Sequence, residues 1–314
     1  MITLIYQLLL QLLYAVYRAT AFVRRQWRRQ VYLRFLRVRY HHNQTPGVIA
    51  QDAARLRKLP SHVACVVRRK PESEEGGGVA GLLDEVSELA AWCLGAGIYR
   101  LSVYERTGVL KRLAQKKHSH GNASKATEEE DDDDDDGEGE SKLQKALLKK
   151  LGVYYGTDAL PSVKIRVPPF TDQDYLLPTT TSALHSSNSH PAEEPHPVIT
   201  RRRRVQRPDL LLTVLAQPDG KATLVDLTRV LADLRVAPAA VTIPALTAQL
   251  RQLGQAEPDL IVLFSSTVDL DGFPPWLVRL AEIFHLPENG GQVSYAVFLK
   301  ALDRYAGAKF NVGK

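Results

Sequence analysis

Short apolar runs alternate along this chain with segments in which apolar residues recur at helical spacing. One unit begins with an apolar run at residues 63–67, continues with a helical pattern from Leu82 to Cys93, and ends with a second run at residues 98–104. Strand, helix and strand with short connections indicate a βαβ unit. Further strands are expected at residues 163–167, 210–215 and 260–264, and further helices at residues 142–151, 221–234 and 244–253. The pattern therefore predicts an α/β fold with an open, mostly parallel sheet flanked by helices.

The segment after the strand at 260–264 continues the pattern. A loop containing Gly, Phe, two Pro and Trp leads into an apolar stretch, and we expect a helix over residues 274–286. A second helix is expected at about residues 294–309. The residues that close this segment are Asn311, Val312, Gly313 and Lys314.

The first residues of the chain differ from the rest. Residues 1–23 are apolar and nearly long enough to cross a bilayer, although Gln7, Gln11 and Arg18 weaken that interpretation. Positive charge follows this stretch instead of preceding it, which favours an anchor over a secretory signal. The sequence therefore predicts a membrane anchor at 1–23, either a span or an interfacial helix, with the following domain on the cytoplasmic side.

Residues 24–58 form a basic amphipathic juxtamembrane segment, because arginines alternate there with aromatic and aliphatic residues. Such a segment suits an anionic membrane surface. A nucleic-acid-binding arm is the less favoured alternative, because such an arm would not explain the preceding apolar run.

Two low-complexity inserts interrupt the alternation. Residues 115–140 are rich in Ser, Gly and acids, and residues 168–208 are rich in Pro, Ser, Thr and His. We expect both to be disordered, since neither can bury enough apolar surface to fold. The second insert ends in the basic run 201–204, interpreted as a flank of the insert in preference to a nuclear signal or nucleic-acid patch. The net charge of +6 is thus an average over segments of opposite sign.

The cysteines and histidines give no sign of a metal or nucleophilic site. Cys65 and Cys93 lie among apolar neighbours and are expected to be core residues in a reducing compartment. The nine histidines lie mostly in polar sequence, without the carboxylate or thiolate partners and rigid spacing that zinc requires. No metal ligand is therefore assigned to this chain.

Four motifs in this order resemble a known family. They are HVACVV at 62–67, AAWCLGAGIYRLSVYERTGVLKR at 90–112, QPDGKATLVDL at 217–227, and the segment from Pro258 onward. Together they resemble the Nogo-B receptor type subunit of dehydrodolichyl diphosphate synthase, a non-catalytic relative of the cis-prenyltransferases. The resemblance implies a cis-prenyltransferase-like domain over 59–314, apart from the inserts, and an N-terminal membrane anchor.

The expected function rests on the positions at which this chain differs from the active enzymes. The resemblance places a magnesium-binding aspartate after the first strand, where this chain has Arg68-Arg69-Lys70. Reversed charge removes the oxygen ligand and repels the cation. A diphosphate-clamping arginine is expected after the strand at 260–264, where Ser265-Ser266 stand instead. Glu282 matches an acidic residue of the active enzymes, and we expect it to be structural or an interface contact.

The resemblance therefore implies a membrane-anchored accessory subunit with no catalytic residue of its own. A catalytic cis-prenyltransferase partner would bind Mg²⁺ and add isopentenyl diphosphate to an allylic diphosphate, in dolichol synthesis for protein glycosylation at the endoplasmic reticulum membrane. From this chain, Asn311, Gly313 and Lys314 are expected to reach the partner's isopentenyl diphosphate site, with Asn311 at a position where the family has arginine. The two helices at 274–286 and 294–309 are the expected interface.

Two other functions stay open from the sequence. One is a self-sufficient homodimeric cis-prenyltransferase, which would elongate allylic diphosphates without a partner. The other is a membrane receptor or scaffold that uses the sheet domain as a lipid-binding module. Neither alternative, nor the favoured one, includes nucleic acid as a partner.

Overall fold

The computed structural model describes residues 2–39, 45–74, 76–115, 141–156, 160–168 and 209–308. The two expected inserts lie outside the described residues except at their margins, Gln115 and Pro168. Residues 309–314, which include Asn311, Gly313 and Lys314, also lie outside them.

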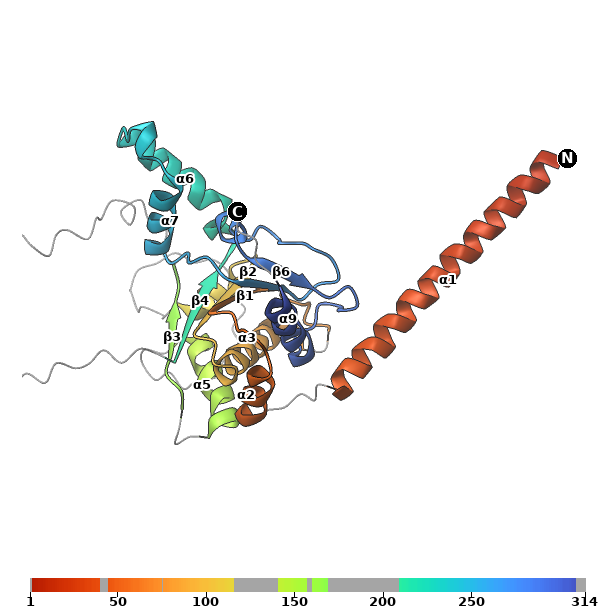
Figure 1. Ribbon diagram of the computed structural model, residues 1–314, viewed down its shortest axis with the longest axis horizontal. Coiled ribbons are helices and arrows are strands. Elements are labelled where there is room, and N and C mark those ends of the chain that lie inside the picture. The colour runs from red at the N-terminus through yellow and green to blue at the C-terminus, as the bar shows by residue number, and fades with distance from the viewer. Residues whose placement is uncertain are drawn as a thin grey trace, which may run out of the picture.

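A six-stranded sheet with the order β3-β4-β2-β1-β5-β6 forms the centre of the domain (Figure 1). Every pairing in it is parallel. The inner strands β1, β2, β4 and β5 are almost wholly buried, as expected where helices cover a parallel sheet. This confirms the predicted fold class. The strands are β1 (His62–Val67), β2 (Arg100–Glu105), β3 (Val163–Arg166), β4 (Leu210–Leu215), β5 (Leu260–Leu263) and β6 (Glu282–His285).

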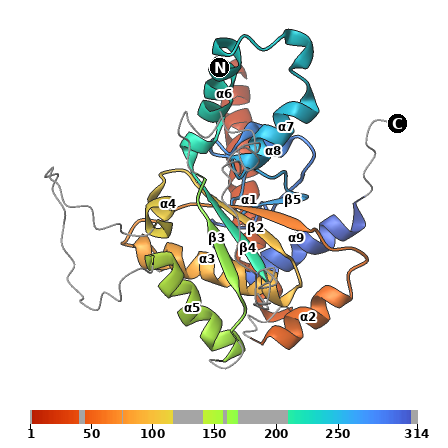
Figure 2. The same ribbon diagram turned by 90° about the vertical axis from the view of Figure 1, so that its left-hand side faces the viewer.

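The helices divide between the two faces and one end of the sheet. The larger core contains residues of α2, α3, α4, α5 and α9 packed on one face. Figure 2 shows α6, α7 and α8 grouped at the end of the domain away from α2 and α5. The helices are α1 (Ile2–Arg39), α2 (Pro46–Ala54), α3 (Gly78–Gly95), α4 (Val109–Ala114), α5 (Lys142–Tyr155), α6 (Lys221–Asp233), α7 (Ile243–Gln252), α8 (Pro275–Val278) and α9 (Tyr295–Gly307).

Trp92 on α3 lies at the centre of the larger core. Its indole N–H donates to the hydroxyl of Tyr154 at 3.1 Å, and its ring centre lies 5.7 Å from that of Tyr295 and 5.8 Å from that of Phe298. Tyr295 in turn donates to the carboxylate of Asp52 at 3.0 Å. These contacts join α2, α3, α5 and α9, with each buried polar group satisfied as its burial requires.

Both cysteines are fully buried free thiols in this core. Burial raises the pKa of the Cys65 and Cys93 thiols, which keeps them protonated and unreactive. The prediction that they are core residues is confirmed.

The expected helix over 274–286 is wrong. Helix α8 ends after four residues, and Glu282–His285 form the edge strand β6. Leu260 of β5 pairs with Glu282, and Leu263 pairs with His285. The backbone of β5 offers hydrogen bonds on this side, and pairing with it outweighs the helical spacing of the apolar residues. All four residues of β6 are only half-buried. The strand therefore shows neither the alternation nor the continuous apolar run by which a strand is recognised in a sequence.

Residues 2–39 form one continuous helix, α1, across the predicted boundary between anchor and basic segment. It stands apart from the sheet domain (Figure 1). Within the described ranges, no helix combines the length and apolar character needed to cross a bilayer. The predicted span at 1–23 is therefore not supported.

His62, the first residue of β1, is a buried neutral imidazole. Its Nδ1 lies 3.1 Å from the backbone oxygen of Glu257, and its Nε2 lies 2.8 Å from Oγ of Ser102. A carbonyl oxygen only accepts, so Nδ1 carries the hydrogen and Nε2 accepts from the serine hydroxyl. Burial lowers the pKa of His62 to about 4, although the Glu257 carbonyl opposes this shift.

We predict a pH-dependent stability that His62 controls. Below the ordinary histidine pKa of 6.5 the unfolded chain binds a proton that the folded chain refuses until about pH 4. The free energy of unfolding should therefore be unaffected by this residue above pH 6.5 and fall by about 1.4 kcal/mol per pH unit below it. Chemical denaturation at pH 7.5 and pH 4.5 measures the effect.

A His62→Gln variant should lose this part of the pH dependence, while His285→Gln, on the edge strand β6, should keep it. Equal pH slopes for wild type and His62→Gln would contradict the prediction.

Candidate functional site

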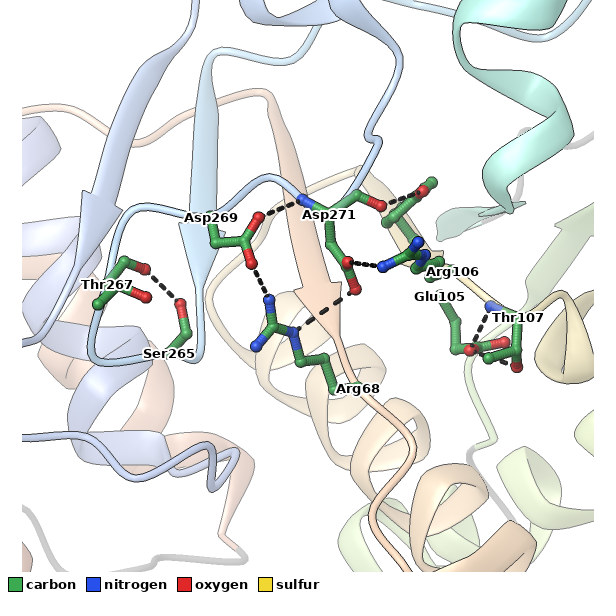
Figure 3. Close-up of polar contacts among 9 residues, drawn as sticks. Arg68, Glu105, Arg106, Thr107, Ser265, Thr267, Asp269 and Asp271 are labelled. Carbon is green, nitrogen blue, oxygen red and sulfur yellow. Dashed lines mark hydrogen bonds and ion pairs between the residues drawn. The ribbon is translucent and has the colours of Figure 1, made fainter.

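The carboxyl ends of β1, β2, β4 and β5 meet at one edge of the sheet, because the strands are parallel. In open α/β sheets this is the edge at which ligands bind. Figure 3 shows residues at and after the carboxyl ends of β1, β2 and β5. They include Arg68 and Ser265, two of the positions at which the sequence departs from the active enzymes.

Arg68, the first residue after β1, is engaged by two carboxylates of the loop after β5. Its Nη2 lies 2.5 Å from Oδ2 of Asp269, and its Nε lies 3.5 Å from Oδ2 of Asp271 (Figure 3). The other two cations of the Arg68-Arg69-Lys70 run are paired as well. Arg69 lies 3.1 Å from Glu72, and Lys70 contacts Glu85 of α3. The reversed charge after β1 is thus neutralised within the chain.

Arg106, after β2, joins the same cluster. Its Nη1 lies 2.9 Å from Oδ1 of Asp271, and the hydroxyl of Tyr104 donates to the Asp271 backbone oxygen at 2.8 Å. The backbone N–H of Asp271 donates to Asp269 at 3.0 Å. This N–H and the Arg68 guanidinium lower the pKa of the Asp269 carboxyl, which stays ionised. We call Arg68, Arg106, Asp269 and Asp271 the ion-pair cluster.

The ion-pair cluster does not fit a magnesium–diphosphate site. Mg²⁺ needs free oxygen ligands, and both carboxylates are already held by guanidinium groups. A diphosphate needs free cations, and both arginines are already held by carboxylates. Among the described residues, no group of three or more His, Cys, Asp or Glu is arranged to hold a metal ion.

The serines after β5 and the glutamate of β6 are placed differently. The hydroxyl of Ser265 donates to the backbone oxygen of Thr267 at 2.6 Å, so its hydrogen bond lies within the loop after β5 (Figure 3). Glu282 begins β6 and pairs with Leu260, the first residue of β5. It therefore lies at the amino ends of the strands, away from the ion-pair cluster.

A buried ion pair, which no sequence pattern indicated, joins two of the quoted motifs. Lys111 of the TGVLKR motif lies 2.6 Å from the carboxylate of Asp219 in the QPDGK motif. The same carboxylate accepts from the Ala216 N–H at 2.8 Å, and the Asp219 backbone oxygen accepts from Gln255 at 2.6 Å. Burial raises the pKa of Asp219 while Lys111 opposes the rise. Leaving Asp219 without Lys111 would cost about 3–5 kcal/mol.

The turn at Gly220 packs against the loop of the ion-pair cluster. A Cβ on Gly220 would lie only 2.6 Å from the backbone oxygen of Gly272, so the approach requires glycine. Beside this contact is a cavity of about 290 Å³, lined by Arg106, Gln217, Asp269, Asp271 and Gly272. Its walls are mostly residues of the ion-pair cluster, whose charges already satisfy one another.

Asn311, Gly313 and Lys314 lie outside the described residues, so their expected role is untested. The last described residue, Ala308, has its backbone oxygen 2.7 Å from Nζ of Lys58. Lys58 precedes β1, so the chain leaves the described domain at the amino ends of the strands. This is the edge opposite the ion-pair cluster.

The known proteins to which this chain is similar include subunits from two fungi and from human. The chain is 30% identical to the dehydrodolichyl diphosphate synthase complex subunit NUS1 of Saccharomyces cerevisiae, over 99% of this chain and 74% of the yeast protein. It is 29% identical to the subunit of the same name from Schizosaccharomyces pombe, over 91% of this chain and 88% of that protein. It is 25% identical to the Homo sapiens subunit, over 84% of this chain and 70% of that protein.

Among solved structures, lavandulyl diphosphate synthase from Lavandula x intermedia, in complex with dimethylallyl diphosphate, matches with a TM-score of 0.43 and 14% identity. The match covers 82% of this chain and 99% of the plant protein. No protein-family model matches the sequence. The identity to the yeast protein, over nearly the whole of this chain, shows that the chain belongs to the NUS1 family of dehydrodolichyl diphosphate synthase complex subunits.

Proposed function

We propose that this chain is the accessory, activating subunit of a heteromeric dehydrodolichyl diphosphate synthase. A catalytic cis-prenyltransferase partner holds Mg²⁺ and adds isopentenyl diphosphate to an allylic diphosphate, at the endoplasmic reticulum membrane and for dolichol synthesis. The observation that carries the proposal is the ion-pair cluster, in which Arg68 and Arg106 are neutralised by Asp269 and Asp271 where an active enzyme needs a free carboxylate. The names of the related proteins support the existence of a complex.

The surface that we assign to the catalytic partner lies on α6, α7 and the segment after α8. Helix α9 is a poor candidate, because eight of its residues are already buried in the core. By contrast, α6 and α7 project from the sheet (Figure 1) and share a small core of Leu227, Leu250 and Leu253. Apolar side chains that stay exposed on and between these two helices, together with one after α8, are Val225, Leu234, Val241, Ile243 and Leu280.

A partner of similar fold suits this pairing surface. Exposed aliphatic residues gathered at one end of a domain are typical of a protein interface. The apolar character of these side chains calls for a partner surface that presents apolar residues. The ion pair of Arg279 with Glu257, 2.7 Å apart, provides a polar margin.

We place α1 on the surface of the membrane. Its first half exposes large apolar side chains, among them Leu9, Leu10 and Leu13. Its second half is rich in arginine, and residues 2–39 contain no Asp or Glu. An apolar face beside a dense basic segment suits an interfacial helix on anionic lipid.

The residues after α9 complete the proposal. Asn311, Gly313 and Lys314 contact isopentenyl diphosphate in the partner's site, through backbone N–H groups beside the glycine and the lysine charge. The position of Ala308 at the edge opposite the ion-pair cluster supports a role in another subunit's site.

Co-expression with a catalytic cis-prenyltransferase tests the function. The two chains should copurify and incorporate isopentenyl diphosphate with Mg²⁺, whereas this chain alone should be inactive. Deleting residues 311–314 should preserve pairing and lower the activity of the complex at least tenfold, by analogy with loss of a charged contact to a diphosphate. Elongation by this chain alone would show a self-sufficient enzyme, and a role that persists without the partner would show a scaffold.

Substitution on α7 tests the pairing surface. Ile243→Asp places a charge on a side chain that is 59% exposed at the start of α7, where the helix itself tolerates an acid. Binding to the partner should weaken by roughly 30-fold or more, as for an interface hot spot. The control is Val153→Asp on α5, which is 61% exposed and lies at the other end of the domain. Equal weakening by both variants, or by neither, contradicts the assignment.

Vesicle flotation tests the placement of α1. The full chain should bind vesicles that contain phosphatidylserine, and binding should weaken with salt. Replacing Arg24, Arg25, Arg28 and Arg29 with glutamine should weaken it by roughly 100-fold or more, at about 1 kcal/mol for each charge near the surface. Replacing Arg201, Arg202, Arg203 and Arg204 removes the same charge elsewhere and should have little effect. Equal binding to neutral vesicles at high salt would contradict an electrostatic interfacial helix.

A further inference from the structure

The exposed side of α5 combines lysines with aliphatic side chains. Lys142, Lys145 and Lys149 follow one another at three- and four-residue spacing, so they share one side of the helix, and all three are exposed. Leu148 and Val153, 39% and 61% exposed, flank them on the same side. Helix α5 contains no Asp or Glu, and its opposite side packs into the larger core. We call these five residues the lysine face.

The lysine face does not contribute its charge to the fold. Lys150, the next residue along the chain, turns to α3 and contacts Asp84 at 2.5 Å and Glu88 at 3.3 Å. Within the ranges that the structure describes, no acid pairs with the side chain of Lys142 or Lys149. Lys142 is also the first residue of α5, where a positive charge opposes the helix dipole. A role in binding explains these charges better than a role in stability.

The lysine face lies at the end of the domain to which α1 is attached. Helix α3 packs against both α2 and α5. Figure 2 shows α2 and α5 at one end of the domain, with α6 and α7 at the other. Arg39 ends α1, and Thr45, six residues later, caps α2. Connectivity alone keeps these two positions within about 22 Å of each other. A membrane surface bound by α1 is therefore within reach of this end.

The chemistry of the lysine face suits anionic lipid better than another protein. Lysine is depleted in the buried centre of protein interfaces. Lysines close to a bilayer are attracted to anionic headgroups, and their aliphatic stems, together with Leu148 and Val153, can pack at the interfacial level. The exposed aliphatic residues of α6 and α7, assigned above to the catalytic partner, have no such row of lysines beside them.

We infer that the lysine face is a second membrane contact, which lies against the same anionic bilayer as α1. This inference rests on the proposed placement of α1 and extends it. One contact would leave the domain free to turn relative to the bilayer, whereas two contacts fix its orientation. The end that carries α6 and α7 then faces away from the lipid, where the catalytic partner can bind it (Figure 2).

Vesicle flotation of the full chain, with the lipid concentration varied to give an affinity, tests the inference. The variant that combines Lys142→Gln, Lys145→Gln and Lys149→Gln should bind phosphatidylserine vesicles roughly 30-fold more weakly than the wild type, because it loses three charges near the surface. Its binding should also depend less on salt. Its unfolding temperature should be unchanged or higher, since Lys142→Gln removes a charge that opposes the helix dipole.

A second triple variant is the matched control. Lys221→Gln, Arg229→Gln and Arg251→Gln remove the same charge from exposed positions on α6 and α7, at the other end of the domain. Charges that far from the bilayer are screened, so vesicle binding should stay within about twofold of the wild type. Equal weakening by the two triple variants would show an effect of net charge and overturn the inference.

Two single variants separate the lysine face from the pairing surface. Val153→Asp should weaken vesicle binding roughly fivefold, because it adds a negative charge to the lysine face, and should leave binding to the catalytic partner in detergent unchanged. Ile243→Asp, on α7, should do the reverse. Vesicle binding that Val153→Asp and Ile243→Asp weaken equally contradicts a contact located at α5.

The acidic run at residues 128–140 directly precedes α5 in the sequence and is the rival ligand of the lysine face. If the lysines bind that run, the α5 triple variant should lose vesicle affinity only in a chain that lacks residues 128–140, and this result would overturn the inference. So would a loss of affinity accompanied by a lower unfolding temperature, or no loss at all. A wild-type chain that does not bind phosphatidylserine vesicles overturns the proposed placement of α1 instead.

Discussion

The parallel arrangement of the six strands is the constraint on which the rest of the molecule depends. Parallel strands collect all of their carboxyl ends at one edge of the sheet and all of their amino ends at the other. Arg68 and Arg106 consequently meet Asp271 at one edge, although Asp271 is far from both in the sequence. Lys58 and Ala308 meet at the opposite edge for the same reason. The fold thus separates the ion-pair cluster from the end of α9.

The ion pairs within the ion-pair cluster and the buried pair of Lys111 with Asp219 have different physical roles. The guanidinium groups of Arg68 and Arg106 are about half exposed to solvent, so each pair contributes at most about 1 kcal/mol to stability. Their main effect is to cancel charge where a ligand would otherwise bind. Lys111 and Asp219 are buried, and they fix the turn at Gly220 against Gly272. Lys111 and Asp219 therefore hold the loops rigidly beside the ion-pair cluster, whose charged groups pair with one another.

Sequence patterns were sufficient for the inner part of the fold. The runs at 63–67, 210–215 and 260–264 are continuous and apolar because helices cover both sides of these strands, and the structure places strands at each of them. Strand β6 escaped prediction because an edge strand that is half-buried shows neither alternation nor a continuous apolar run. Its conformation is decided by β5, which no local pattern reveals.

The site could be predicted only in part. The substitutions at Arg68 and Ser265 were apparent from the resemblance, since they concern single positions after recognisable strands. The partners of Arg68, and the contact between Lys111 and Asp219, depend on which loops the sheet brings together. The roles proposed for Asn311, Gly313 and Lys314 involve a second subunit, and these residues lie outside the described part of the chain.

The central claim is that the ion-pair cluster leaves this chain without a magnesium–diphosphate site of its own. Calorimetric titration of inorganic pyrophosphate into the purified chain, with and without Mg²⁺, tests it most directly, with Arg68→Ala measured in parallel. The account predicts no saturable Mg²⁺-dependent binding in the wild type. Binding of one pyrophosphate per chain that requires Mg²⁺ and is lost in Arg68→Ala would contradict it.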